Sequence, residues 1–411
     1  MTATAPRRRG THLRATDLQG ASRLAIDATL GLTDLVENLH HTILRAPGPL
    51  GTPTTQPAGG ITGLVYRSIR GVTRLVGSSL DALLGQVVAW AGPGSGVASA
   101  EREAVIAALN GVLGDHLADT ANPLAIQMHL CHAGAPLPLD GASPAHASGR
   151  VLLLVHGLCM NPGQWLRNGH DHGAMLAAET GRTPLYLHYN SGLPIAANGQ
   201  QLADLMQRLS EAWPLPLQEL VIVGHSMGGL VARSAVAQAM ARGDTWPKRL
   251  SAMAFLGTPH HGAPLERGGH GIDVILGANP YTAAFARLGR VRSAGINDLR
   301  HGTVLDGDDD AAARGTTRAQ RRLPTRVPLP PGVACYAVAG LLGGEAGALH
   351  GRLLGDGLVP VASALGQHRT RSRDLQFDPA RTFVAQGVGH LALLDSTAVA
   401  KRLRAWLRTA A

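Results

Sequence analysis

Two long segments near the start of the chain carry apolar residues at helical spacing. In residues 18–45 and 61–90, apolar side chains recur every three or four positions, which is the pattern of a helix with one buried stripe. Residues 46–60 are rich in Pro, Gly and Thr and are expected to form a loop. A third helix is expected after Ser99, which suits a helix N-cap. We therefore predict a helical extension over residues 1–120, whose stripe packs on a neighbouring domain or, alternatively, on a membrane surface.

The pattern changes at about residue 121, where short apolar runs begin to alternate with helical segments. The expected strands are Ile126–His132, Val151–Val155, Pro184–Tyr189, Glu219–Val223, Leu250–Leu256, Val333–Ala339 and Thr382–Gln386. The expected helices are Ala174–Thr180, Gly199–Ala212, Met227–Arg242 and Leu391–Leu407. This alternation predicts an α/β fold, a mostly parallel sheet with helices on both faces. Residues 260–332 interrupt it without a convincing strand. We interpret them as a cap inserted after the strand Leu250–Leu256, taken as the sixth strand of the fold, in a catalytic domain over residues 121–411.

The motif Gly224–Gly229 carries the clearest chemical signal. It reads Gly-His-Ser-Met-Gly-Gly, follows the uninterrupted apolar run Leu220–Val223 and opens a helical segment. A GxSxG turn between a strand and a helix is a nucleophile elbow, in which the serine is lifted above the edge of the sheet. We therefore predict that Ser226 is the nucleophile.

A serine nucleophile needs a base and an acid that orients the base. In a fold of this class, the acid and then the histidine follow the serine along the chain. His390 lies after the last expected strand and is the predicted base, and Asp356, between two glycines after the preceding strand, is the predicted acid. His350 comes before the acid, so its order is wrong. Asp395 is too close to His390 along the chain to reach Nδ1.

Two backbone N–H groups are expected to form the oxyanion hole. One belongs to Met227, directly after the nucleophile, and the other to Leu158, in the loop after the strand Val151–Val155. His156 opens this loop and is expected to order it beside the substrate. Cys159 is interpreted as a small apolar filler, not as a nucleophile.

The start of the predicted cap supplies candidate substrate contacts. His260 and His261 follow the strand Leu250–Leu256, and His260 is expected to line the rim of the pocket. Ile272 and Ile275 are expected to face an acyl chain. No acidic residue or cysteine stands near the two histidines at a metal-binding spacing, so we predict no metal site there.

Composition narrows the class of protein further. The net charge is +9 and the pI about 10.3, but Lys248 and Lys401 are the only lysines, so the remaining 35 basic residues are arginines. This bias, with abundant Ala and Gly, is typical of a GC-rich genome. Aromatic residues make up only 3%, which disfavours a surface that stacks on bases, and we predict no nucleic-acid partner.

Three classes of extracytoplasmic or membrane protein are disfavoured by the sequence. No apolar run approaches the roughly 18–20 residues that span a bilayer. Three cysteines are too few for a disulfide-rich secreted domain. Arg7–Arg9 is not followed by the apolar stretch of a signal peptide. We therefore predict a cytoplasmic protein, with membrane association through the N-terminal helices as an open alternative.

Five short motifs together resemble the lipase and esterase branch of the α/β-hydrolase family. They are His156-Gly157-Leu158, Gly224–Gly229, Leu256–Gly262, Asp356–Pro360 and Gly389-His390. The resemblance covers about residues 126–411 and includes bacterial hydrolases similar to the PGAP1-like inositol-deacylase group and to triacylglycerol lipases. It implies a serine ester hydrolase that needs no cofactor and acts on a small-molecule or lipid ester. Leu391 and Ala392 follow the histidine, where calcium-binding bacterial lipases carry an acidic residue, so calcium is not implied. An acyltransferase with the same triad, or a non-catalytic protein that binds lipids or membranes, remains an alternative.

Overall fold

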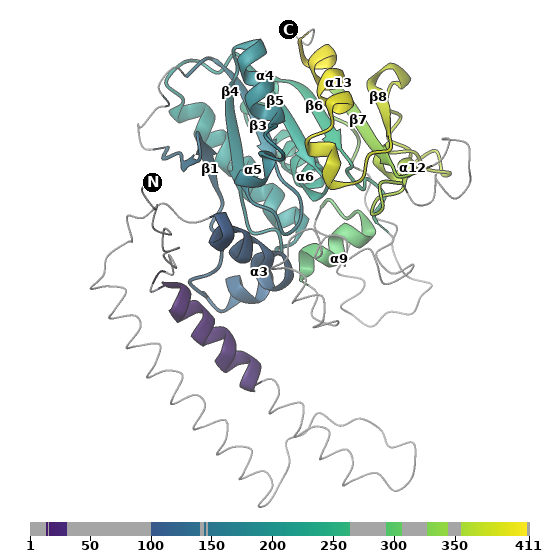
Figure 1. The fold of residues 1–411 in the computed structure, drawn as a ribbon. Helices are drawn as coiled ribbons and strands as arrows, with labels where there is room; N and C mark the ends of the chain where they lie inside the picture. Colours follow the sequence, from purple (N-terminus) through teal and green to yellow (C-terminus); the bar gives the residue numbers. More distant parts are fainter. Residues whose placement is uncertain are drawn as a thin grey trace, which may run out of the picture. The chain divides into compact units, whose positions relative to one another are not determined.

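The computed structural model describes residue 14 and residues 16–30, 100–139, 144, 147–263, 293–305, 327–343 and 355–408 (Figure 1). The chain divides into two compact units, which are described separately. The first comprises Met1–Arg102 and Leu117–Ala125, and the second comprises Glu103–His116 and Ile126–Ala411. The predicted helix 61–90 lies outside the described residues, and the predicted helix 18–45 is described only as far as residue 30.

The first unit is held by an ion pair and by a buried amide. Residues 16–30 form a helix that places Asp17 beside Arg102, whose guanidinium donates to both carboxylate oxygens at 2.5 and 2.6 Å. Asn122 Nδ2 donates to the carbonyl of Gly20 at 3.1 Å, and Arg23 Nη1 donates to the carbonyl of Ala121 at 2.9 Å. The N-terminal helix therefore packs on the short segment that follows residue 116.

The second unit is built on an eight-stranded sheet. Its strands are β1 (His129–His132), β2 (Ala135–Pro136), β3 (Arg150–Val155), β4 (Thr183–His188), β5 (Glu219–His225), β6 (Leu250–Leu256), β7 (Ala334–Leu341) and β8 (Thr382–Gln386). Their order in the sheet is β2-β1-β4-β3-β5-β6-β7-β8. β1 pairs antiparallel with β2 and with β4, and every other pair is parallel. The predicted α/β class is confirmed.

Helices cover both faces of this sheet (Figure 1). They are α3 (Ala100–Asp119), α4 (His172–Thr180), α5 (Ile195–Ala212), α6 (Met227–Arg242), α9 (Ala294–His301), α12 (Val361–Ala364) and α13 (Thr397–Arg408), with 3-10 turns η1 (Pro162–Trp165), η2 (Trp246–Arg249), η4 (Pro379–Arg381) and η5 (Leu391–Leu394). Alternate residues of β3 face opposite layers, as the period of a strand requires. Leu153 packs with α5 and α6, whereas Leu152 and Leu154 pack with α4 and α13. The continuous apolar run of this strand is explained by burial on both faces.

The structure differs from the sequence-based expectation at several elements. The final helix is not continuous, because the 3-10 turn Leu391–Leu394 ends before Asp395 and α13 starts anew at Thr397. Ser396 accepts a hydrogen bond from the N–H of Val399 and so caps the new helix. The first strand is shorter than expected, and β2 and α9 were not expected at all.

The predicted cap is described only in part. Within residues 260–332, the structure describes 260–263, 293–305 and 327–332, and α9 lies in the second of these stretches. The cap and the domain boundary at residue 120 remain predictions. Among the described helices, none is both long enough and apolar enough to cross a membrane.

Candidate active site

Ser226 stands in the sharp turn between β5 and α6. Its backbone has φ 54° and ψ −125°, in the region of positive φ that residues with a Cβ rarely adopt. Two hydrogen bonds hold it there: Ser226 N–H donates to the carbonyl of Leu256 at 2.8 Å, and Gly229 N–H donates to the carbonyl of Ser226 at 3.1 Å. The conformation is that of a nucleophile elbow, as the motif predicts.

The glycines of the motif are required by close backbone approaches. A Cβ at Gly228 would lie 2.2 Å from the carbonyl oxygen of Val155, and one at Gly224 would lie 2.6 Å from the Cα of Gly229. Both contacts are shorter than atoms can tolerate, and the neighbours are backbone atoms that cannot rotate away. Gly228 therefore lets the start of α6 approach the end of β3, where the predicted oxyanion loop begins.

Asp356 and His390 form a buried acid–base pair. His390 Nδ1 lies 2.7 Å from Asp356 Oδ2, and the His390 N–H also donates to the Asp356 carbonyl at 3.0 Å. The other carboxylate oxygen accepts hydrogen bonds from the N–H groups of Leu358 at 3.0 Å and Val359 at 2.8 Å. The carboxylate only accepts, so Nδ1 carries the proton and Nε2 keeps a lone pair. This is the tautomer that a general base needs.

The loop after β6 joins the serine to this pair. Leu256 accepts the hydrogen bond of Ser226, and the next residue, Gly257, has φ 58°. A Cβ at Gly257 would lie 3.1 Å from Asp356 Oδ2 and 3.2 Å from His390 Cε1. The structure therefore brings the three predicted residues, Ser226, Asp356 and His390, to one region at the carboxyl ends of the central strands.

His225, which precedes the serine, packs against His390. Its ring centroid lies 4.8 Å from that of His390, and its Nε2 lies 3.1 Å from the His390 carbonyl oxygen. Complete burial, and then the neighbouring His390, hold the pKa of His225 well below its usual value. The ring is thus neutral and donates from Nε2, which holds the backbone of His390 in place.

The predicted oxyanion loop follows β3. None of the hydrogen bonds made by the described residues uses the backbone N–H of Leu158 or of Met227, so both donors are available to a ligand. The next residue, Cys159, has φ 59°, and its N–H donates to Ser191 Oγ at 3.0 Å. A Cβ at Gly157 would lie only 3.0 Å from the Cβ of Ser226, so this loop passes directly beside the elbow.

His156 lies beneath the loop. Its ring stacks on Tyr189 with centroids 4.4 Å apart, and Tyr189 Oη donates to the His156 carbonyl at 2.8 Å. Burial lowers the pKa of His156 to about 4, although a hydrogen bond with the Gly157 carbonyl opposes the shift. The side chain has no exposed surface. It therefore supports the loop, and its predicted part in substrate binding gains no support from this position.

Helix α3 packs on the loop after β3 through Gly111 and on the loop after β4 through Gly114. A Cβ at Gly111 would lie 2.2 Å from Cys159 Sγ, and one at Gly114 would lie 1.9 Å from Asn190 Oδ1. Asn190 Nδ2 donates to the carbonyl of Gly114 at 2.8 Å. Burial raises the pKa of the Cys159 thiol to about 12, so it stays protonated and fills space, as the sequence analysis predicts.

Of the remaining predicted substrate contacts, the structure describes only His260. His260 is buried, with its ring centroid 4.9 Å from Phe255 and 5.4 Å from Phe377, and its Nδ1 lies 3.2 Å from Arg233 Nη1. Burial, and then Arg233, hold its pKa well below the usual value. His260 is therefore packed among these side chains, and its predicted place at the pocket rim gains no support from this position. Ile272 and Ile275 lie outside the described residues.

Sequence reasoning missed the residues that hold the histidine loop from outside. His172 Nε2 lies 2.9 Å from the carbonyl oxygen of Leu393, three residues beyond the base. Asp395 accepts from Asn168 Nδ2 at 2.5 Å and lies 3.4 Å from Arg167 Nε. Asp395 is therefore engaged away from the His390 imidazole. These partners come from the start of α4 and the segment just before it, and no local pattern in the sequence reveals them.

Comparison with known proteins gives one family match and several structural likenesses. No curated protein matches the chain. Residues 146–323 match the family model of the PGAP1-like alpha/beta domain. The chain is similar to the mature lipase BlEst2 of Bacillus licheniformis, with 18% identity over 65% of this chain and 92% of that chain and a TM-score of 0.37. It is also similar to a putative aryl esterase from Burkholderia cenocepacia, with 14% identity over 69% and 94% of the two chains and a TM-score of 0.37.

The sheet and the family match lead to the same assignment. The sheet is mostly parallel with an antiparallel edge, a serine elbow follows β5, and a carboxylate and a histidine follow the last two strands. These features occur together in one known fold. The matched segment holds the oxyanion loop and the elbow. Residues 146–323 are thus similar to the PGAP1-like alpha/beta domain, and the sheet, the elbow and the chain order have the arrangement of the α/β-hydrolase fold.

Proposed function

We propose that this protein is a serine-dependent carboxylic ester hydrolase. The contact between Asp356 Oδ2 and His390 Nδ1, 2.7 Å long and buried beside the Ser226 elbow, is the observation that carries the proposal. A buried carboxylate that bonds to Nδ1 keeps the histidine in the tautomer whose Nε2 can take a proton from a nucleophile.

The reaction follows from the roles of the three side chains. Ser226 Oγ attacks the ester carbonyl carbon while His390 Nε2 accepts its proton. Asp356 holds the ring and stabilises the imidazolium, and His390 then gives the proton to the leaving alcohol oxygen. Water, activated by the same Nε2, attacks the acyl-enzyme, releases the carboxylic acid and restores the serine.

The oxyanion of each tetrahedral intermediate would be bound by the N–H groups of Leu158 and Met227. Both are unpaired within the described part of the chain, and Met227 stands at the N-terminus of α6, where the helix dipole favours negative charge. Loss of one such donor costs about 10²–10³ in kcat. The hydrogen bond from Cys159 to Ser191 would keep the loop in the required shape.

We assign the substrate to esters with an apolar acyl group, lipids among them. Two sequence features support this assignment: the resemblance to lipases, and the cap predicted over residues 260–332 with Ile272 and Ile275. Replacing both isoleucines with Asp should depress turnover of long-chain esters far more than turnover of acetate. Equal losses for both chain lengths would remove the acyl-binding role.

The decisive experiment compares two serine variants. Ser226→Ala should abolish hydrolysis of p-nitrophenyl esters from acetate to palmitate, and also labelling by a fluorophosphonate probe. Ser210→Ala, a matched change on helix α5, should keep both, because its hydroxyl only bonds to the carbonyl of Gln207. Full labelling of the Ser226→Ala protein would refute the proposal. Ester exchange that requires an added alcohol, with no free acid formed, would make the protein an acyltransferase instead.

A further inference from the structure

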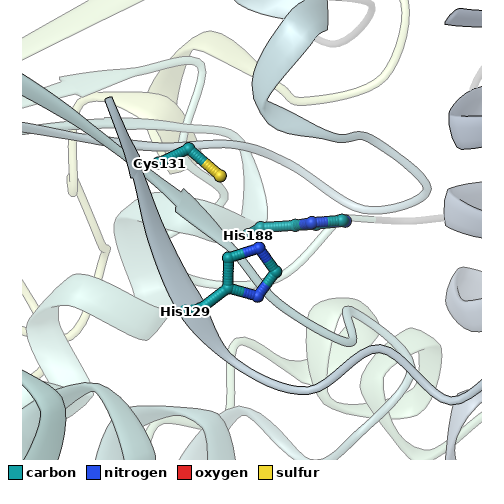
Figure 2. A group of neighbouring side chains, drawn as sticks. All are labelled: His129, Cys131 and His188. Atoms are coloured by element: carbon teal, nitrogen blue, oxygen red, sulfur yellow. The ribbon is translucent and has the colours of Figure 1, made fainter. Parts of the chain in front are cut away.

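Three potential metal ligands meet at the antiparallel edge of the sheet, and the proposed hydrolysis uses none of them. They are His129 and Cys131 on β1 and His188 on β4 (Figure 2). His129 and His188 are direct partners in the strand pairing, and Cys131 lies two residues along the same face as His129. One ligand atom from each lies within 4.8 Å of the others.

His129 is held in the tautomer that a metal needs. Its Nδ1 lies 2.8 Å from the carbonyl oxygen of Gln127. A carbonyl only accepts, so Nδ1 carries the proton and Nε2 presents a lone pair. A backbone carbonyl that binds the second ring nitrogen in this way is the usual companion of a metal-bound histidine.

His188 offers a buried nitrogen without a partner. The residue is only 9% exposed, and its Nε2 has no hydrogen-bond partner among the described residues. An unpaired polar atom at this depth is costly unless something binds it. Burial, and then the nearby His156 and His129, lower the pKa of His188 to about 3, so the ring is neutral at physiological pH.

Cys131 completes the set with a sulfur atom. It is a free cysteine, 8% exposed, and Figure 2 shows its sulfur directed toward the His188 ring. Burial, and then Glu103, raise the pKa of its thiol to about 11. Without a metal ion the thiol therefore stays protonated at neutral pH.

Packing alone explains only part of this arrangement. The rings of His129 and His188 make an edge contact with centroids 5.0 Å apart, which accounts for their closeness but leaves Nε2 of His188 unpaired. The pair His170 and His172 is different, because its ring nitrogens bond to each other at 2.8 Å. In the β1–β4 cluster, by contrast, Nε2 of His188 stays unpaired among the described residues and lies beside a thiol.

We propose that His129, Cys131 and His188 bind a Zn²⁺ ion, with a water molecule as the fourth ligand. A site made of two imidazoles and a thiolate selects zinc rather than magnesium or calcium. Zn–N bonds of about 2.0–2.1 Å and a Zn–S bond of about 2.3 Å place tetrahedral ligand atoms about 3.3–3.6 Å apart. The ligand atoms now lie within 4.8 Å of one another, so binding requires the side chains to move closer together.

The binding step is balanced by one proton. The Zn–S bond forms as the S–H bond of Cys131 breaks, and the proton passes to water; the two neutral imidazoles bind without losing a proton. The ion would fasten β1 to β4 across their antiparallel pairing. His188 also lies near His156, with ring centroids 6.4 Å apart, at the start of the oxyanion loop. The site stands whether or not the protein hydrolyses esters.

Cobalt(II) substitution tests this proposal directly. The chelator-treated protein should take up one Co²⁺ and gain the near-ultraviolet charge-transfer band of a thiolate–cobalt bond, and Zn²⁺ should displace it and raise the melting temperature. Cys131→Ala should remove the band and weaken Zn²⁺ binding. His129→Ala, at a partly exposed position that tolerates change, should weaken Zn²⁺ binding at least about tenfold. Removing only the hydrogen-bond partner of a metal ligand already costs about tenfold or more in metal affinity.

Cys335→Ala is the matched control. Cys335 is a free, buried cysteine on β7, outside the cluster, so its loss should leave the cobalt band and the Zn²⁺ affinity unchanged. A cobalt complex without a thiolate band, a band that survives Cys131→Ala, or equal zinc binding by His129→Ala and the parent protein would overturn the proposal. Circular dichroism of each variant separates loss of a ligand from loss of the fold.

Discussion

The elbow conformation of Ser226 should store strain that glycine would release. At φ 54° and ψ −125°, the Cβ of any side chain meets the backbone unfavourably, and such residues cost about 1–3 kcal/mol. Ser226→Gly removes the Cβ, whereas Ser226→Ala keeps it. Both changes remove the hydroxyl, so the difference between the two variants isolates the backbone.

The expected difference follows from two opposing terms. Relief of strain favours the glycine variant by about 1–3 kcal/mol. The greater freedom of glycine in the unfolded chain opposes it by about 0.4–1 kcal/mol. Ser226→Gly should therefore be more stable than Ser226→Ala by about 1 kcal/mol, which corresponds to about 2–4 °C in melting temperature for a domain of this size.

Thermal unfolding of both variants measures this difference, and a second pair supplies the control. Ser210 lies within helix α5, where glycine is less favourable than alanine by about 1 kcal/mol. Ser210→Gly should therefore melt below Ser210→Ala, the opposite order from the elbow pair. If Ser226→Gly melts at or below Ser226→Ala, the elbow holds no strain and the reasoning is refuted.

Three further predictions concern the acid, two buried histidines and His225. Asp356→Asn should lower kcat by about 10⁴ in an ester assay; near-normal turnover would point to another carboxylate. Burial lowers the pKa of His156 and of His172 to about 4 in the folded protein, against about 6.5 in the unfolded chain. The free energy of unfolding should therefore be unaffected by these groups above pH 6.5 and fall as the pH drops toward 4, by up to about 1.4 kcal/mol per pH unit for each histidine. Melting curves across this range should show the fall, and His172→Gln should reduce it. His225→Phe removes the hydrogen bond to the carbonyl of His390 and should cost about 0.5–1.5 kcal/mol in urea unfolding, with lower kcat; an unchanged midpoint would contradict it.

The parts of the structure governed by local pattern were predictable. Helix α6 begins and ends where expected, at Met227 and Arg242, because the elbow marks its start and Gly243, with φ 79°, its end. β6 and β8 also have the expected bounds. The order serine, acid, histidine along the chain is a property of the fold class, and the elbow conformation of Ser226 and the Asp356–His390 contact agree with it.

What depends on partners distant in sequence was not predictable. His129 and Cys131 are visible as a short motif, but His188 joins them only through the pairing of β1 with β4. The burial of His260 depends on Phe377 and Arg233, which come from other elements. The break before α13 carried a local signal, Asp395-Ser396-Thr397, that the apolar periodicity of the segment concealed.

The contact between α3 and the loop after β3 determines how far the chain can be shortened. Residues Glu103–His116 belong to the same compact unit as the sheet, although the sequence places them before its first strand. A fragment that starts at Ile126 would keep every described strand and Ser226, Asp356 and His390, yet expose Cys159 and leave Asn190 without the Gly114 carbonyl. The shortest fragment suited to expression and crystallisation therefore starts no later than Glu103.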